Sequence, residues 1–366
     1  MWRTRIAAVT ATVTIIAVGG AVATARADGP GRPLYGDLNG DNLLDRAWLD
    51  DAPPRGCAVR VEFGRPGGGY LPAREYTYPG PGGGASTACP DLGVAVDLDG
   101  VGGAELVVGW FNGRPGGAGP DLLVLRDFRV WTGFRAIRRP NFIGLADFNG
   151  DGRLDLYAWT DQGQGLATYL NDGTGTLRPG PVRYCGAPID HRLADFDRDG
   201  AMDVAIAYVR GCASGSSGVV VVLDDGTVVP LQSAAGGRPS WTINVLDADR
   251  NGVPDVLTYS QSTGQPATFL GVGNGTFVAS PLAVRDALTV SGRTPTTVPV
   301  LRNDWTSRRV AVSIVTPPTV GTVRVVAGRT VVYTPGTVPG VTDRFVYRIT
   351  QDGRTSDAVV ILKVVP

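Results

Sequence analysis

A nine-residue acidic motif occurs five times along this chain of 366 residues. Self-similarity at a nearly constant period indicates a repeat architecture, and it constrains the fold more than any other feature of the sequence. The copies start 48 to 60 residues apart. We call them loops one to five, and they read DLNGDNLLD (37–45), DLDGVGGAE (97–105), DFNGDGRLD (147–155), DFDRDGAMD (195–203) and DADRNGVPD (247–255).

The spacing of oxygen-bearing residues predicts a cation site in each loop. Hard cations such as calcium take six to eight oxygen ligands at about 2.3–2.6 Å. Side chains at positions 1, 3 and 5 can converge on one ion if position 6, usually glycine, takes a positive φ. Position 7 then offers its carbonyl, and the acid at position 9 closes the shell. Solvated acidic turns are the alternative, which five regularly spaced copies disfavour.

Two loops depart from the pattern. Loop one has Asn42 at position 6, and asparagine tolerates the positive φ needed there better than most residues do. Loop two has Val101 at position 5, so it lacks the side-chain oxygen of that position. Loop four has four carboxylates, so we expect it to bind calcium most tightly and loop two least tightly. The predicted ligands are Asp37, Asn39, Asp41, Leu43 and Asp45; Asp97, Asp99 and Glu105; Asp147, Asn149, Asp151, Arg153 and Asp155; Asp195, Asp197, Asp199, Ala201 and Asp203; and Asp247, Asp249, Asn251, Val253 and Asp255.

The flanking sequence argues against an EF-hand. That motif places its last acid at position 12 between two helices. Here the last acid is at position 9, and the flanks of loop three, NFIGLAD and LYAWT, are typical of short strands. Each loop is therefore expected to join two strands of a hairpin.

A second turn recurs in phase with the loops. RPGGGY, NDGTGT, DDGT and GNGT follow loops one, three, four and five, and no helical pattern follows them, which disfavours a phosphate cradle. Hairpin turns fit better. Each unit then contains four antiparallel strands in about 50 residues, as a β-propeller blade does.

Over residues 33–280 these loops and turns resemble FG-GAP/VCBS repeats, the calcium-binding blades also found in integrin-type propellers. The resemblance implies an all-β propeller with calcium held by positions 1, 3, 5, 7 and 9 of each loop. Integrin-type propellers usually have seven blades, whereas this segment has room for about five. A five-bladed ring and an incomplete ring closed by another chain both stay open.

The C-terminal segment has no acidic loop of this type. Alternating stretches such as GTVRVV and RFVYRI, separated by Pro/Gly turns, predict a β-sandwich over residues 282–366. The segment resembles bacterial Ig-like (cadherin-like) domains in VLRND (300–304), GTVRVVAGRTVVYTPG (321–336) and TDRFVYRITQDG (342–353). Such domains commonly serve as spacers or adhesion modules. The predicted division is therefore a propeller over residues 28–281 and an Ig-like sandwich over 282–366.

The N-terminus has the pattern of a secretory signal peptide over residues 1–27. Two arginines precede an apolar stretch, and the small residues of ARA predict cleavage after Ala27. An uncleaved anchor is the alternative. We expect a secreted protein without a membrane span in the mature chain.

Four cysteines fit an oxidising compartment. They allow three pairings, and we predict the local one, Cys57 with Cys89 and Cys185 with Cys212. Each bond would stabilise the fold by roughly 3–4 kcal/mol in the chain-entropy model. Four buried free thiols are the alternative, and a zinc site is disfavoured because no C-x-x-C occurs.

Charge and residue usage disfavour other functions. The chain has 34 basic and 34 acidic residues, which is unlike the basic face of a nucleic-acid-binding protein. We predict no catalytic residue, because sixteen acids lie in the five loops and the single histidine, His191, is expected to pack near a blade edge. The aromatics at 110–111 and in VWTGF (130–134) could stack on sugars, but we favour blade core for them.

These observations favour a secreted, non-catalytic, calcium-binding repeat protein used in extracellular binding or adhesion. Its partner would be an extracellular protein or a glycan. Two alternatives are a carbohydrate-binding lectin of the same architecture and a polysaccharide-active enzyme with its site on the propeller face.

Overall fold

The structure is a computed structural model, and it is all-β apart from one 3-10 turn, Val300–Arg302, in the residues described. The predicted signal peptide, residues 1–27, lies outside the described residues. Among the described residues, no helix is long and apolar enough to cross a bilayer. The described residues are 32–365 without 53–55, 80–88, 112–118, 161–163, 213–214, 235–240, 262–263, 292–293, 307–308 and 338–339.

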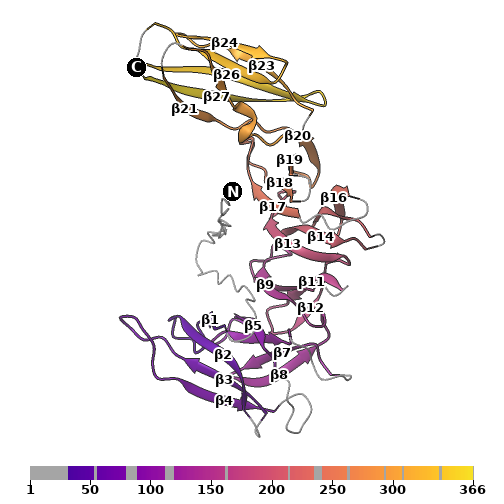
Figure 1. The fold of residues 1–366 in the computed structure, drawn as a ribbon. Helices are drawn as coiled ribbons and strands as arrows, with labels where there is room; N and C mark the ends of the chain where they lie inside the picture. Colours follow the sequence, from indigo (N-terminus) through magenta and orange to yellow (C-terminus); the bar gives the residue numbers. More distant parts are fainter. Residues whose placement is uncertain are drawn as a thin grey trace, which may run out of the picture. The chain divides into compact units, whose positions relative to one another are not determined.

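In the described part of the chain, twenty strands form five successive four-stranded antiparallel sheets; their place along the chain can be followed in Figure 1. In each sheet the strand order follows the chain, as in a blade. The strands are β1 (Leu34–Gly36), β2 (Asp45–Ala52), β3 (Gly56–Glu62) and β4 (Arg74–Tyr78); β5 (Leu92–Val96), β6 (Glu105–Gly109), β7 (Leu122–Arg126) and β8 (Arg129–Phe134); β9 (Phe142–Ala146), β10 (Asp155–Thr160), β11 (Gly165–Asn171) and β12 (Leu177–Tyr184); β13 (Ala187–Ala194), β14 (Asp203–Arg210), β15 (Ser217–Val222) and β16 (Val228–Ala234); and β17 (Trp241–Leu246), β18 (Asp255–Ser260), β19 (Gln265–Gly271) and β20 (Phe277–Ser280).

The acidic loops and the later turns occupy the same places in every sheet. Each acidic loop joins the first and second strands, and its position 9 is the first residue of the second strand. The later turn joins the third and fourth strands; in sheet four it is closed by the Leu223 N–H on the Thr227 carbonyl at 2.9 Å. The predicted four-stranded repeat unit is confirmed. A closed propeller is not found in the described residues, and a five-bladed ring and an incomplete ring both stay open.

The inner strands of each sheet form the core. β6 (ELVVG) and β15 (SGVVVV) are buried along their whole length, because their apolar residues are not interrupted by polar ones. The described residues divide into two compact units. The first contains the described residues up to Arg135 together with Phe142–Leu145, and the second contains Ala136–Asn141 together with the described residues from Ala146 onward. Within each unit, apolar side chains of neighbouring sheets pack together, as Leu106 and Val59 do in the first.

Two disulfides each join one sheet to the next. Cys57 of β3 bonds Cys89, which precedes β5, and Cys185, between β12 and β13, bonds Cys212 after β14. The predicted pairing is therefore confirmed.

The C-terminal segment folds as two packed sheets, which supports the predicted Ig-like sandwich. The sheet orders are β21-β27-β26-β23 and β22-β25-β24, and the β21–β27 pair is parallel. Alternate residues such as Val331, Phe345 and Tyr347 point into a shared core. The strands are β21 (Asp286–Ser291), β22 (Thr296–Val298), β23 (Ala311–Thr316), β24 (Thr322–Val326), β25 (Thr330–Thr334), β26 (Thr342–Gln351) and β27 (Arg354–Val365).

The predicted roles of the aromatic residues hold only in part. Trp110 is buried as blade core, but Phe111 and Trp131 are 38% and 39% exposed, so the core interpretation is wrong for them. Trp131 lies on β8, the outermost strand of its sheet, whose residues are almost all exposed. His191 is packed as predicted: its Nε2 lies 2.8 Å from the Tyr157 hydroxyl and its ring contacts that of Trp159.

Candidate metal-binding loops

The acid at position 9 anchors every loop. All five such residues are at most 1% exposed. In loop three, Asp155 accepts the N–H of Phe148, at position 2, and the N–H of Asn171, at the later turn, at 2.8 and 2.7 Å. Corresponding donor pairs reach Asp45 (Leu38, Gly64), Asp203 (Phe196, Asp224) and Asp255 (Ala248, Gly271). This carboxylate therefore ties the loop to the end of the third strand.

The carboxylate at position 1 organises the curl of the loop. In loop three the Asp147 side chain accepts the N–H groups of Asn149, Asp151 and Gly152. Loop four repeats this with Asp195 and the N–H groups of residues 198, 199 and 200. The backbone thus wraps around the first aspartate, which brings positions 3 and 5 to its side.

Two residues per loop take a positive φ, one more than the sequence predicted. Position 6 does so in every loop, and Asn42 in loop one has φ 62°. Position 4 also does so in every loop: it is glycine in loops one to three, whereas Arg198 and Arg250 have φ 68° and 64°. Glycine at position 4 of loops one to three was the sequence signal for this second positive φ, but arginine at the same position of loops four and five obscured it.

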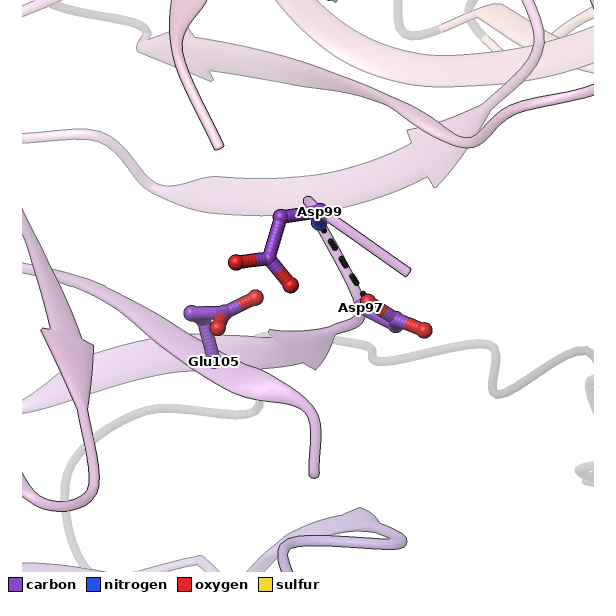
Figure 2. Close-up of side chains that lie close together, drawn as sticks. All are labelled: Asp97, Asp99 and Glu105. Atoms are coloured by element: carbon purple, nitrogen blue, oxygen red, sulfur yellow. Dashed lines mark hydrogen bonds between the residues drawn. The ribbon is translucent and has the colours of Figure 1, made fainter. Parts of the chain in front are cut away.

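The predicted side-chain ligands converge most clearly in loops two, four and five. Three carboxylates offer oxygens within 4.8 Å of one another in each of these loops. Figure 2 shows loop two, where the carboxylates of Asp99 and Glu105 point toward each other and the Asp99 N–H bonds Asp97. The groups are Asp97, Asp99 and Glu105; Asp195, Asp197 and Asp199; Asp197, Asp203 and Asp224; and Asp247, Asp249 and Asp255. Asp224, outside the nine-residue motif, was missed because it belongs to the later turn.

Loops one and three place an asparagine where the others have a third clustered acid. Asn149 donates from its side chain to Asp151 at 2.9 Å, and Asn39 does so to Asp41 at 3.1 Å. The amide thereby joins positions 3 and 5. At position 7, the N–H groups of Leu43, Arg153, Ala201 and Val253 all donate to position 5, while the role of their carbonyls as ligands stays a prediction.

Burial and crowding make these carboxylates costly to ionise without a cation. Burial raises the pKa of Asp155 to about 6 and that of Asp203 to about 7, and nearby aspartates add to both shifts. The pKa values of Asp45, Glu105 and Asp255 are also raised, mainly by burial. An all-oxygen, anionic donor set of this kind fits a hard divalent cation.

Family comparisons agree with the two parts of the fold. A family model described as an FG-GAP-like repeat matches residues 147–206, which run from loop three through loop four into β14. A family model described as a bacterial Ig domain matches residues 278–363. No curated protein matches the chain. The chain thus contains an FG-GAP-like repeat followed by a bacterial Ig domain, a combination that suggests an extracellular protein of the binding or adhesion type.

Proposed function

We propose that this protein is a secreted, non-catalytic, calcium-binding repeat protein that acts in extracellular binding or adhesion. The observation that carries the proposal is the convergence of carboxylates in loops that occupy the same place in each sheet. The FG-GAP-like repeat, the Ig domain and the two disulfides support an extracellular role.

Calcium would serve to hold the loops rather than to perform chemistry. In loop four, Asp195, Asp197 and Asp199 would bind the ion with their side chains. Bound calcium would offset the mutual repulsion of these groups and favour the ionised form of buried Asp203. The loops would then fix the connections between first and second strands.

Thermal unfolding tests the metal. A cation that binds only the folded chain adds about 2.7 kcal/mol of stability at a hundredfold excess over its Kd. We expect the unfolding temperature to rise with calcium and to fall with excess chelator. Asp197→Asn should weaken this response, whereas Asp225→Asn, an exposed acid beside the same site, should leave it unchanged. An unfolding temperature that is equal in calcium and chelator would exclude the metal.

A glycan is the ligand class with a specific observation in its favour. Trp131 is partly exposed on an outer strand, and although Arg126 lies against one face of its ring, the exposed part of the ring can stack on a sugar. A glycan array with the whole protein and with Trp131→Ala tests this, and Val228→Ala on the outer strand of sheet four serves as the control. If Trp131→Ala loses a glycan signal that wild type and Val228→Ala keep, the protein is a lectin. In a separate activity assay, turnover of a polysaccharide would contradict the non-catalytic assignment.

A further inference from the structure

Loop two differs from the other loops in what lies against its acids. Position 5 is Val101, whose side chain is exposed and has no oxygen to offer. The guanidinium of Arg126 fills this lack: its Nε donates to Glu105 Oε1 at 3.2 Å, and its Nη2 pairs with Asp99. One side chain thus bridges positions 3 and 9, the same carboxylates that a metal in this loop would have to share.

Neighbouring residues hold Arg126 in this position. It is the last residue of β7 and pairs in register with Arg129 across the tight turn to β8. The Trp131 ring lies against the guanidinium, with Cζ 3.6 Å from the ring centroid. An aromatic face attracts a cation and restricts the orientation of its plane. The guanidinium is therefore placed by the fold of the hairpin as well as by its charge partners.

The other repeats show what Arg126 replaces. In sheet four, Val204 pairs with Val222, so the residue opposite the buried Asp203 is Leu223, which is itself buried. In sheet two, Leu106 pairs with Leu125, so the residue opposite Glu105 is Arg126, and its side chain bonds Glu105. The same register position thus carries a guanidinium beside loop two and a buried apolar side chain beside loop four.

We propose that Arg126 is the resident cation of loop two, so that this loop is held closed without a metal ion. The proposal deepens the calcium function proposed above and rests on it for the other loops. A guanidinium keeps its charge at any physiological pH and binds two carboxylates with a fixed geometry. A metal that entered loop two would have to displace this group from Asp99 and Glu105.

Hydrogen exchange of the full-length protein, followed by mass spectrometry, tests the proposal. The reporter peptide covers residues 97–105, in which the N–H groups of Leu98 and Val101 bond Glu105 and Asp99. Arg126→Met keeps an apolar side chain and removes the charge. Arg135→Met is the matched control, because Arg135 pairs with Asp121 in the same unit, and Asp121 is not one of the three loop-two acids drawn in Figure 2.

In chelator, we expect Arg126→Met to exchange roughly tenfold faster than wild type in this peptide, and Arg135→Met to match wild type. Wild type should exchange equally with calcium and with chelator. Calcium should restore protection in Arg126→Met, because three carboxylates without a counterion become available. Unchanged exchange of Arg126→Met in chelator, or calcium-dependent protection of this peptide in wild type, would overturn the proposal.

The comparison in chelator separates this proposal from the calcium function. If no loop responds to calcium, the proposed calcium function fails, yet Arg126→Met in chelator still decides whether the guanidinium holds loop two.

Discussion

The Asp147 carbonyl accepts the N–H of Met202 at 2.8 Å, which joins loop three directly to loop four. The same bond joins loops one and two, where the Ala104 N–H donates to the Asp37 carbonyl at 2.7 Å. In both pairs, position 1 of one loop accepts from position 8 of the next. Loop five has Pro254 at position 8, which has no N–H to donate to loop four.

This bond predicts a specific cost for proline at position 8 of loop four. Met202→Pro should lower the free energy of unfolding by about 1–3 kcal/mol, because the Asp147 carbonyl loses its partner. Met202→Ala keeps the N–H and is the control. Chemical denaturation of both variants provides the measurement, and equal losses would show that the side chain rather than the bond matters.

Much of the repeat could be predicted from the sequence because its signals are local. The motif and its flanks predicted that each loop joins two strands of a hairpin. Asp155 and its counterparts are the first residues of the second strands, and their burial follows from that position. The cysteine pairing was also predictable, since Cys57 and Cys89 are only 32 positions apart in the sequence. The bond between Asp147 and Met202 was not, because it joins loops whose relative placement depends on packing between sheets.

The loops should differ in calcium binding in the order predicted from their oxygens. Asp199→Ala should weaken calcium binding at loop four, because it removes one of the clustered carboxylates. Asp99→Ala should leave the amount of bound calcium nearly unchanged, since its structural partner is Arg126. Calorimetric calcium titrations of the two variants compare these losses. A larger loss for Asp99→Ala would show that the number of oxygens does not rank the sites.

The backbone conformation of the loops gives a prediction that involves no contact at all. Gly152 has φ 83°, and a Cβ added there would meet open space. Gly152→Ala should therefore destabilise the fold by about 1–2 kcal/mol through backbone strain alone. Gly215, which also faces open space but has no positive φ, is the control and should tolerate alanine. Thermal unfolding distinguishes them, and equal tolerance would contradict the strain argument.

Long-range features of the site escaped the sequence. Arg126 lies 27 residues from Asp99, and nothing in the motif indicates that its guanidinium returns to the loop. The exposure of Trp131 was missed for a related reason, because an apolar-looking strand at the outer edge of a sheet has the same composition as an inner one.

The Ig domain contains two contrasting buried acid sites. Asp343 accepts N–H groups from Thr319 and Gly321 and the hydroxyl of Tyr333; burial alone would raise its pKa, but these bonds keep the pKa below its usual value. Asp286 and Asp304 each have a buried Oδ2 without a hydrogen-bond partner in the described structure. Burial raises the pKa of both to about 6, and for Asp286 the charge of Asp304 adds to the shift.

This pair predicts that stability falls as the pH rises. The ordinary pKa of these groups is 3.8, so the folded state holds protons that the unfolded chain has released. The resulting stabilisation is complete below about pH 4 and is lost as the pH passes through about 6. Asp304→Asn cannot ionise, so its unfolding temperature relative to wild type should rise across that interval. Asp357→Asn, whose exposed carboxylate has its pKa lowered by Arg348, should show no such rise. Calorimetric scans at several pH values and constant calcium measure both differences, and parallel curves for wild type and Asp304→Asn would show that the pair does not titrate in this interval.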